Sequence, residues 1–167
     1  MIRAATHKDS LSIAEIHVAS WKHTYVGQMP DDLLRNLSVI SRDKGWRDIL
    51  SSHAHDVLVA EEEGMPIGFV HLGTSGDDDS SLTTSGEIYA LYLYPEHMRR
   101  GIGGSLWRMA ITTLQERGFK EVRVWVLATH TRAHRFYERQ GCVIDGTTKT
   151  ITLGGAPLET VRYRLKL

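Results

Sequence analysis

Three glycines and two arginines stand where a strand pattern gives way to a helix pattern. The strand pattern stops at Pro95, and apolar side chains recur at helical spacing from Ile102 onward. The first backbone N–H groups of a helix have no partner inside it, and this end of the helix dipole is positive. Glycines let an anion approach such amides closely, and arginine side chains add positive charge. The segment therefore predicts a site for a phosphorylated ligand, formed by Arg99, Arg100, Gly101, Ile102, Gly103 and Gly104.

Two common phosphate-binding motifs do not fit this segment. A Walker-type loop requires Gly-Lys followed by Ser or Thr, which this sequence lacks. In a dinucleotide-binding fingerprint that begins at Gly101, the third glycine would fall on Leu106. A plain strand-to-helix turn is the remaining alternative to an anion site.

The elements around this turn alternate between strand and helix patterns. Period-two runs predict strands over residues 2–5, 57–60, 67–72, 86–94, 121–127, 143–151 and 158–167. The biased stretch 75–85 is expected to be a mobile surface loop, and residues 53–55 a solvated turn. An antiparallel front half followed by strand–helix–strand–helix predicts a mixed sheet with helices on both faces.

Helix boundaries follow from capping residues and helix-ending glycines. Thr6 and Asp9 resemble a capping box before a helix that reaches Tyr25. Pro30 and two aspartates open a second helix, and Ser41 is expected to cap a third. Two later helices are expected to end at Gly118 and Gly141.

The chain has the size and balance of one domain, which we expect to span residues 1–167. Hydrophobic residues make up 41% and charged residues 24%, and no apolar stretch approaches the length of a membrane span. The start lacks the apolar core of a signal peptide, so none is expected. The single Cys142 excludes an internal disulfide framework and suits a reducing compartment, so we expect a cytoplasmic protein.

Charge is balanced overall but uneven along the chain. Twenty basic residues match twenty acidic ones, so nothing predicts a nucleic-acid partner for the whole chain. Between Met98 and Gly141, however, nine Lys and Arg residues stand against three acidic residues. This basic segment suits a small polyanion, although a solvated helix face explains part of the charge.

The segment from Leu91 to Leu106 resembles the cofactor loop of the GNAT superfamily of N-acetyltransferases, whose pattern is Gln/Arg-x-x-Gly-x-Gly/Ala. Downstream, Ala133-His-Arg-Phe-Tyr-Glu-Arg-Gln-Gly141 resembles the second cofactor segment of that superfamily, which commonly ends Phe-Tyr-Glu-x-x-Gly-Phe. The order and separation of the two motifs also agree, so the resemblance covers nearly the whole chain. It implies an α/β (α+β) fold with a mixed, mostly antiparallel central sheet of six to seven strands. It also implies an acetyltransferase that moves an acetyl group from acetyl-CoA to a primary amine by direct attack in a ternary complex.

The resemblance also assigns residues to the cofactor. The pyrophosphate of acetyl-CoA is expected on the backbone amides of residues 99–104, and the pantetheine arm beside Leu91, Tyr92 and Leu93. The Leu93 amide would bond the thioester oxygen, and His130 stands where relatives often have an Asn that contacts the cofactor.

This sequence departs from the family pattern at Met98, where Gln or Arg is usual, so one side-chain bond is lost there. Cys142 replaces the usual Phe, which we interpret as a packing change. The Met98 departure motivates an alternative function, a catalytically inactive CoA-binding sensor or partner module.

Amine acetylation needs a neutral amine and a proton for the leaving thiolate. Glu87, on the strand before the glycine turn, resembles in its spacing the catalytic glutamate of the histone-acetylating branch and is the candidate base. Alternation predicts that Glu87, Tyr89, Leu91 and Leu93 share one face of that strand. The alternative for Glu87 is a salt-bridged strand residue. Tyr137 falls at the family position whose hydroxyl protonates the thiolate, with a half-buried core tyrosine as the alternative.

The acceptor is expected beside the first helix, where Trp21, Thr24 and Tyr25 are candidate substrate-binding residues. For Trp21 a core position on the helix stripe is favoured. Excess negative charge outside the basic segment favours a cationic acceptor, and a small molecule is preferred to a protein. His130 and His134 have metal-ligand spacing but lack a third ligand, so no metal is expected. No membrane partner is expected, and a homodimer remains open.

Overall fold

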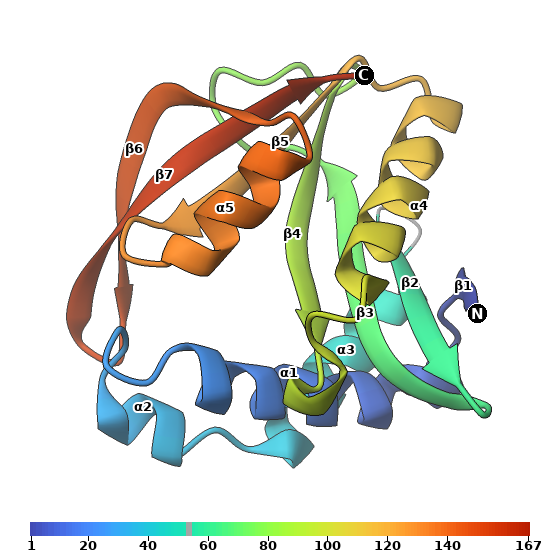
Figure 1. Cartoon of the computed structure of the whole chain (residues 1–167), viewed down its shortest axis with the longest axis vertical. Coiled ribbons are helices and arrows are strands. Elements are labelled where there is room, and N and C mark those ends of the chain that lie inside the picture. The colour runs from blue at the N-terminus through green and yellow to red at the C-terminus, as the bar shows by residue number, and fades with distance from the viewer. Residues whose placement is uncertain (53–54) are drawn as a thin grey trace.

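The computed structural model describes residues 1–52 and 55–167, and within them seven strands form one sheet in the order β1-β2-β3-β4-β5-β7-β6 (Figure 1). The strands are β1 (Ile2–Ala4), β2 (His55–Glu62), β3 (Met65–Thr74), β4 (Ser85–Leu93), β5 (Glu121–Leu127), β6 (Val143–Leu153) and β7 (Ala156–Lys166). β4 and β5 pair in parallel, whereas the other neighbouring strands pair antiparallel. The mixed, mostly antiparallel sheet predicted from the sequence is confirmed.

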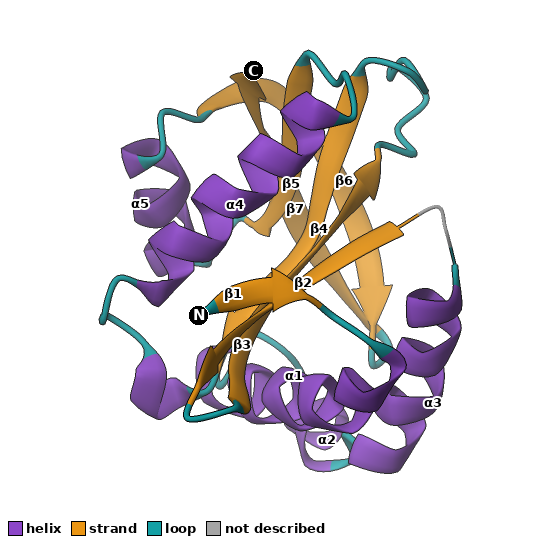
Figure 2. Cartoon of the chain, turned by 90° about the vertical axis from the view of Figure 1, so that its right-hand side faces the viewer, coloured by secondary structure: helices purple, strands orange, loops and turns teal. Residues whose placement is uncertain are grey.

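Five α-helices cover the two faces of this sheet in the described residues (Figure 2). They are α1 (Ser10–Thr24), α2 (Asp31–Arg35), α3 (Val39–Ser51), α4 (Ile102–Glu116) and α5 (Thr131–Arg139). Two short 3-10 turns, η1 (His7–Asp9) and η2 (Pro95–His97), precede α1 and the glycine turn. None of the helices in the described part of the chain is long and apolar enough to span a membrane.

Each face of the sheet has its own core. On one face, Leu106 and Leu114 of α4 are fully buried together with Val122 of β5. On the other face, Ile13 of α1 packs with Trp46 of α3 in a second cluster. The sheet is therefore sandwiched between α4 and α5 on one side and α1 and α3 on the other, which fixes the direction from which each ligand can approach.

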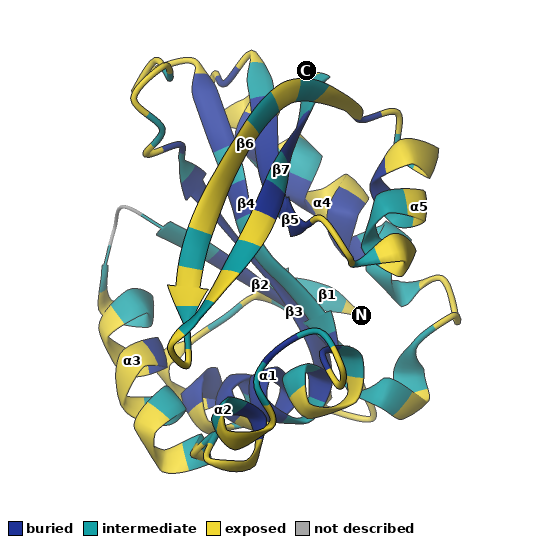
Figure 3. Cartoon of the chain, turned by 90° about the vertical axis from the view of Figure 1, so that its left-hand side faces the viewer, coloured by how far each residue is buried: buried dark blue, intermediate teal, exposed yellow. Residues whose placement is uncertain are grey.

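A third, smaller cluster joins the linker after α1 to the far end of the sheet. Tyr25 and Met29 from the linker are buried against Leu127 at the end of β5. The tip of the β6–β7 hairpin packs on α2, because a Cβ built on Gly154 would lie 3.0 Å from the Cβ of Leu33. β6 itself is a largely exposed edge strand (Figure 3).

Several expected boundaries hold, and some need correction. Thr6 donates its amide N–H to the Asp9 carboxylate over 2.7 Å, as the capping pattern predicted. The prediction that Ser41 caps α3 was wrong. Ser38 caps this helix, and its Oγ accepts a hydrogen bond from the backbone N–H of Ser41 over 3.2 Å. The expected turn over 53–55 falls partly on residues 53 and 54, which lie outside the described residues, and His55 begins β2.

The prediction that Glu87, Tyr89, Leu91 and Leu93 share one face of β4 is wrong. Tyr89 is an extra residue in the ladder, because Ala90 pairs with His71 while Ile88 pairs with the next residue of β3. This β-bulge reverses the alternation. Leu91 and Leu93 consequently face α4, with methyl groups 3.7 and 3.5 Å from a Cβ built on Gly103. Glu87 lies on the opposite face, because Ile88 beside it belongs to the core under α4.

The acidic stretch between β3 and β4 is not only a solvated loop. Asp79 contacts two buried arginines, at 2.6 Å from Arg123 and 2.7 Å from Arg162. Asp77, which is itself mostly buried, lies 3.1 Å from the same Arg162. The loop is thus tied down over β5 and β7 by its aspartates.

Candidate active site

The glycine turn begins α4 with a left-handed residue. Gly101 has φ 84° and precedes the first helical residue, and Arg99 has φ 62°. Glycine adopts the left-handed region without strain, so Gly101 lets the chain turn sharply from η2 into the helix. The first intrahelical bond runs from the Ser105 N–H to the Gly101 carbonyl oxygen. The amides before Ser105 therefore have no partner within α4 and can bind an anion.

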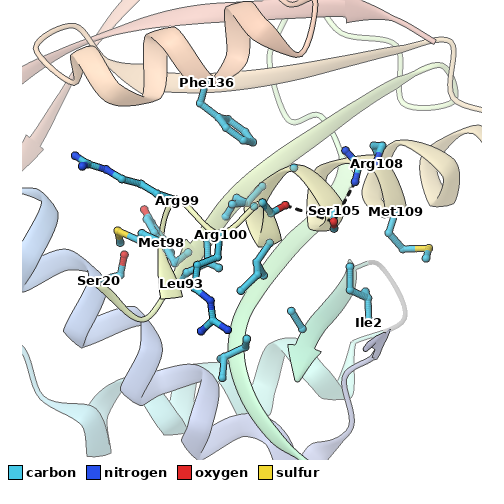
Figure 4. Close-up of a pocket in the computed structure, with 18 of the residues that line it drawn as sticks. Ile2, Ser20, Leu93, Met98, Arg99, Arg100, Ser105, Arg108, Met109 and Phe136 are labelled. Carbon is cyan, nitrogen blue, oxygen red and sulfur yellow. Dashed lines mark hydrogen bonds between the residues drawn. The ribbon is translucent and has the colours of Figure 1, made fainter. Parts of the chain in front are cut away.

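A groove of about 1730 Å³ runs from this turn to the start of α5 (Figure 4). Leu91, Leu93 and Ile102 give it apolar walls, and Phe136 of α5 points toward the turn. Its basic lining residues are Arg99, Arg100, Arg108, Arg132, Arg135 and Arg139. A long groove with apolar walls and a basic rim suits a ligand that combines phosphates with a less polar arm.

The charge of these arginines is only partly neutralised. Arg100 pairs with Glu62 of the β2–β3 hairpin over 2.8 Å. Burial, and then the positive charge of Arg99, lower the pKa of Arg132. Two guanidinium groups that repel each other beside unpaired helix amides favour a bound anion.

The seam between β4 and β5 opens beyond its first residues. The parallel pairing joins Ser85–Glu87 to Glu121–Arg123, after which the strands diverge (Figure 1). On the other side of β4, the Tyr94 N–H bonds the Ile67 carbonyl oxygen over 3.0 Å. In an antiparallel ladder such bonded pairs alternate with non-bonded ones, so the N–H groups of Leu91 and Leu93 point toward the open seam. An extended arm can therefore pair with this edge of β4.

All the residues predicted to bind the cofactor line the same groove. They are Leu91, Tyr92, Leu93, Arg99, Arg100, Gly101, Ile102, Gly103, Gly104, His130 and Tyr137. Of the predicted substrate-binding residues, Thr24 lines it as well. Glu87, Trp21 and Tyr25 do not, and they lie on the face of the sheet covered by α1.

Tyr137 is a buried lining residue at the α5 side of the groove. Its ring packs against Trp107 with centroids 5.5 Å apart. Burial raises the pKa of Tyr137 well above its usual value, with further contributions from Tyr92 and Cys142. The hydroxyl is therefore protonated at neutral pH and can act as a donor into the groove.

His130 precedes α5 and packs edge-on against Tyr25, with centroids 5.4 Å apart. Burial, followed by the positive charge of Arg132, lowers the pKa of His130 to about 4. The imidazole is neutral at physiological pH, so it offers hydrogen bonds rather than charge to a ligand.

Glu87 is the last residue of β4 that pairs with β5, and it lies beside the acidic loop. Its Oε2 accepts a hydrogen bond from the Ser75 hydroxyl over 3.2 Å. Burial, and then the negative charge of Asp77, raise the pKa of Glu87. A carboxylate with a raised pKa is a better proton acceptor at neutral pH than an exposed glutamate. The expected alternative, a salt-bridged strand residue, receives little support from these contacts.

The acceptor-side candidates are held by packing. Tyr25 is buried, and its hydroxyl lies 3.4 Å from that of Tyr92, which itself lines the groove. Trp21 is half-buried beneath the guanidinium of Arg42, 5.2 Å from the ring centre. Trp21 and Tyr25 thus support the wall between α1 and the groove.

The histidine pair at metal-ligand spacing is used in packing. His134 Nδ1 lies 2.8 Å from the Tyr163 hydroxyl, and its Nε2 lies 3.1 Å from the Leu127 carbonyl oxygen. In the described ranges 1–52 and 55–167, no group of His, Cys, Asp and Glu residues could hold a metal ion. Cys142 is buried, and burial raises the pKa of its thiol to about 12, so it is a poor nucleophile.

Two residues that line the groove, Ser20 and Arg132, were not predicted from the sequence. Ser20 of α1 and Met98 both line the groove (Figure 4), and Arg132 contacts the Met98 sulfur at 2.6 Å. The excess of basic residues after Met98 included Arg132, but spacing alone did not show that it would reach back to the turn. Ser20 carried no signal, because a small residue on a helix stripe is usually a packing residue.

Comparison with known proteins agrees with this geometry. The profile of the Acetyltransferase (GNAT) family matches residues 13–142, which include the glycine turn and α5. An uncharacterized N-acetyltransferase of Bacillus subtilis (strain 168) is 33% identical over 127 residues, covering 75% of this chain and 70% of that protein. A spermidine N(1)-acetyltransferase of Thermoplasma acidophilum is 26% identical over 151 residues, covering 87% of this chain and 89% of that protein.

Among solved structures, the PaiA N-acetyltransferase of Thermoplasma acidophilum in complex with coenzyme A shares the fold. The TM-score is 0.76 at 22% identity, with 100% of this chain and 98% of that one covered. The family profile spans both motifs, and the fold agrees over the full length. The chain therefore belongs to the acetyltransferase (GNAT) family and is an acyl-CoA-dependent N-acetyltransferase.

Proposed function

We propose that the groove binds acetyl-CoA and that the enzyme transfers the acetyl group to a primary amine of a small molecule in a ternary complex. The observation that carries this proposal is the open seam between β4 and β5 beside the glycine turn. Along this seam, N–H groups of β4 that are not paired with β5 can bind a pantetheine arm. At its end, the unpaired N–H groups of the first turn of α4 can bind a pyrophosphate.

The residues present fit this co-substrate. The amides before Ser105 and the side chains of Arg99 and Arg132 would hold the pyrophosphate, and the edge of β4 would hold the pantetheine arm. When bound, acetyl-CoA supplies an activated thioester. The atoms nearest to a Cβ built on Gly103 belong to Leu93, Leu91 and Phe136 and lie at 3.5–3.7 Å, so this glycine is not required by the protein's own packing. Its lack of a side chain leaves the helix amides accessible.

The Leu93 amide would stabilise the oxygen of the reacting carbonyl. It points into the open seam rather than into the β3 ladder. A fixed backbone N–H aimed at a developing oxyanion lowers the barrier without reorganisation. Leu93 is buried and its strand is paired on the far side, so this donor is held rigidly.

Glu87 would accept the proton of the incoming ammonium through a chain of water molecules, because six residues of strand, about 20 Å, separate it from the Leu93 amide. Burial and Asp77 keep its pKa raised, which matches a base that must accept a proton near neutral pH. Tyr137 would donate its hydroxyl proton toward the departing sulfur. Burial raises the pKa of a thiol as well as that of the Tyr137 hydroxyl, so proton transfer from Tyr137 to a thiolate in the same surroundings is not opposed by burial alone.

A small amine acceptor is supported by the relative from Thermoplasma acidophilum that acts on spermidine. The carboxylates near the sheet face opposite α4, Asp77 and Glu87, also favour an acceptor that carries positive charge.

Calorimetric titration of acetyl-CoA into the pure protein, with ATP and NAD as controls, tests the cofactor half of this proposal. We expect saturable binding of acetyl-CoA in the micromolar range and none of NAD. Absence of acetyl-CoA binding would refute it, and the roles of Glu87 and Tyr137 would fall with it.

A further inference from the structure

An ammonium group lies over the face of Trp125 in this structure, and it belongs to the chain itself. The Nζ of Lys149, from edge strand β6, is 4.0 Å from the centre of the Trp125 ring. The same Nζ is 4.0 Å from Oδ1 of Asp77. An aromatic face with a carboxylate at its edge is an arrangement that binds cations.

The walls of this arrangement are fixed. The Trp125 indole donates its N–H to Asp77 Oδ1 over 3.1 Å. Asp77 is also paired with the buried Arg162 at 3.1 Å, and only 12% of its side chain is exposed. The ring and the carboxylate therefore keep their positions whether or not Lys149 is present.

The occupant, in contrast, is free to leave. The side chain of Lys149 is 48% exposed and comes from an edge strand. A long, flexible lysine loses rotamer freedom when it is held in one place, and a cation–π contact at an exposed site is weak. A second ammonium group of similar size can therefore compete for the same position.

This cation site lies next to the candidate base. Glu87 pairs with Arg123, two residues before Trp125 on the same strand, so Trp125 shares the side of the sheet on which Glu87 lies. Both Asp77 and Lys149 act electrostatically on the Glu87 carboxylate. A ligand held at Trp125 is thus presented to the same side of the open seam as the base.

We propose that Trp125 and Asp77 bind a non-reacting ammonium group of the acceptor, and that Lys149 occupies this site until the acceptor displaces it. This inference rests on the proposed function. An ammonium held against a carboxylate and a ring keeps its proton and cannot attack a thioester. The reacting amine is consequently a second one, and the acceptor is an aliphatic diamine or polyamine.

The first test follows the indole N–H resonance of Trp125 while 1,4-diaminobutane is added without acetyl-CoA. The resonance is assigned by its loss in Trp125→Phe, and those of Trp21, Trp46 and Trp107 serve as internal references. We expect a saturable shift at Trp125. In Lys149→Met the half-saturating concentration should fall roughly three- to tenfold, because the internal competitor is gone.

Lys166→Met is the matched control, since it removes the same charge from the hairpin at the position paired with Glu121. It should leave the titration as in the parent protein. Equal effects of the two lysine variants would overturn the proposal, because they would show a general charge effect. A titration of Lys149→Met in which Trp125 does not respond would overturn it as well.

A second test compares acceptors of one and two amines. In Trp125→Leu, kcat/KM for 1,4-diaminobutane should fall roughly tenfold relative to that for 1-aminobutane. Equal loss for both amines would contradict a site for the second ammonium. The resonance titration needs no acetyl transfer, so failure of this inference can be separated from failure of the proposed function, which the acetyl-CoA titration detects.

Discussion

Glu87 and Leu93 stand on one strand but on opposite faces of the sheet, because the extra residue Tyr89 interrupts the alternation of β4. The groove proposed to bind acetyl-CoA is lined by Leu93 on the face of β4 that is packed against α4. Glu87, the proposed base, and the neighbouring Asp77 lie on the opposite face, which α1 and α3 cover. If Glu87 accepts the proton and the Leu93 amide binds the thioester, as we propose, the two substrates enter from opposite faces of the sheet.

Replacement of Glu87 by Gln tests the base. We expect kcat/KM to fall roughly a hundredfold, the usual contribution of a positioned base. The proposed role requires Glu87 to be ionised, so activity of the parent enzyme should fall as the pH drops through the pKa of this carboxyl group. Burial and the charge of Asp77 raise that pKa, so the acidic limb of the pH–activity profile should lie at a higher pH than for an ordinary glutamate. The limb should vanish in Glu87→Gln and persist in the exposed-residue control Glu159→Gln. An unchanged pH profile in Glu87→Gln would exclude this role.

The Tyr137→Phe substitution removes only a hydroxyl. We expect kcat to fall by roughly one to two orders of magnitude while the KM for acetyl-CoA changes little. The ring contacts with Trp107 and Phe136 are kept, so thermal unfolding should be nearly unchanged. A full rate in this variant would assign Tyr137 to packing alone.

Gly103→Val tests the helix amides. A Cβ at this position makes only ordinary contacts with the protein, and thermal unfolding of the variant checks that the two γ-methyl groups are tolerated. The added side chain covers the amides of the turn, and the Kd for acetyl-CoA should rise roughly tenfold, because the phosphates lose hydrogen bonds to these amides. Gly45→Ala is the control, because a Cβ there meets nothing within 4 Å and the residue lies inside α3. This control should bind acetyl-CoA normally. Equal affinity of Gly103→Val and the parent protein would place the phosphates elsewhere.

Gly45→Ala also carries a stability prediction of its own. Alanine in a helix interior is favoured over glycine by roughly 0.5–1 kcal/mol, and the open space around Gly45 removes any steric cost. The free energy of unfolding in urea should rise by this amount. A decrease would show that α3 is strained at this position.

Arg162 holds the acidic loop to the sheet. Its guanidinium lies 2.7 Å from Asp145 and contacts Asp77 and Asp79 of the loop, and its side chain is 3% exposed. Arg162→Met removes one of the two buried guanidinium groups that contact Asp77 and Asp79, and the one that contacts Asp145 most closely, so the free energy of unfolding should fall by about 3 kcal/mol. The matched control is Arg35→Met, whose exposed partner is Asp32 and whose loss should cost under about 1 kcal/mol. Equal losses would contradict a structural role for the network.

The same network predicts a dependence of stability on pH. Hydrogen bonds from Arg162, against a smaller effect of burial, lower the pKa of Asp79, and the pKa of Asp145 is lowered as well. Groups with depressed pKa values stabilise the fold above their unfolded pKa and lose that contribution as the pH falls. Unfolding of the parent protein should therefore become easier below about pH 4, and this dependence should be shallower in Arg162→Met.

Most of the fold could be predicted because most helices and strands begin and end at residues that short sequence patterns identify. Gly118 and Gly141 end their helices with φ of 88° and 85°, and the glycine turn lies at the start of α4. The bulge at Tyr89 was not predictable, because it is defined by the register of β4 against β3. That register depends on packing across the whole sheet.

The groove proposed to bind acetyl-CoA could be predicted from two sequence motifs, but the acceptor side could not. Trp125 and Lys149 are far apart in the sequence, and their contact depends on how β6 folds back along β7 and β5. The acidic composition of the loop was recognised in the sequence. Its arginine partners were not, because Arg123 and Arg162 come from two different strands. Such contacts follow from topology rather than from spacing.

The most direct measurement of the central claim is the release of free thiol from acetyl-CoA by the pure enzyme with 1,4-diaminobutane, spermidine and a panel of other small primary amines. Mass spectrometry of the amine would identify the product. We predict amine-dependent thiol release with formation of a mono-acetylated amine, lost together in Glu87→Gln. Saturable binding of acetyl-CoA with no thiol release for any amine in the panel would contradict the assignment of a small-molecule amine acceptor.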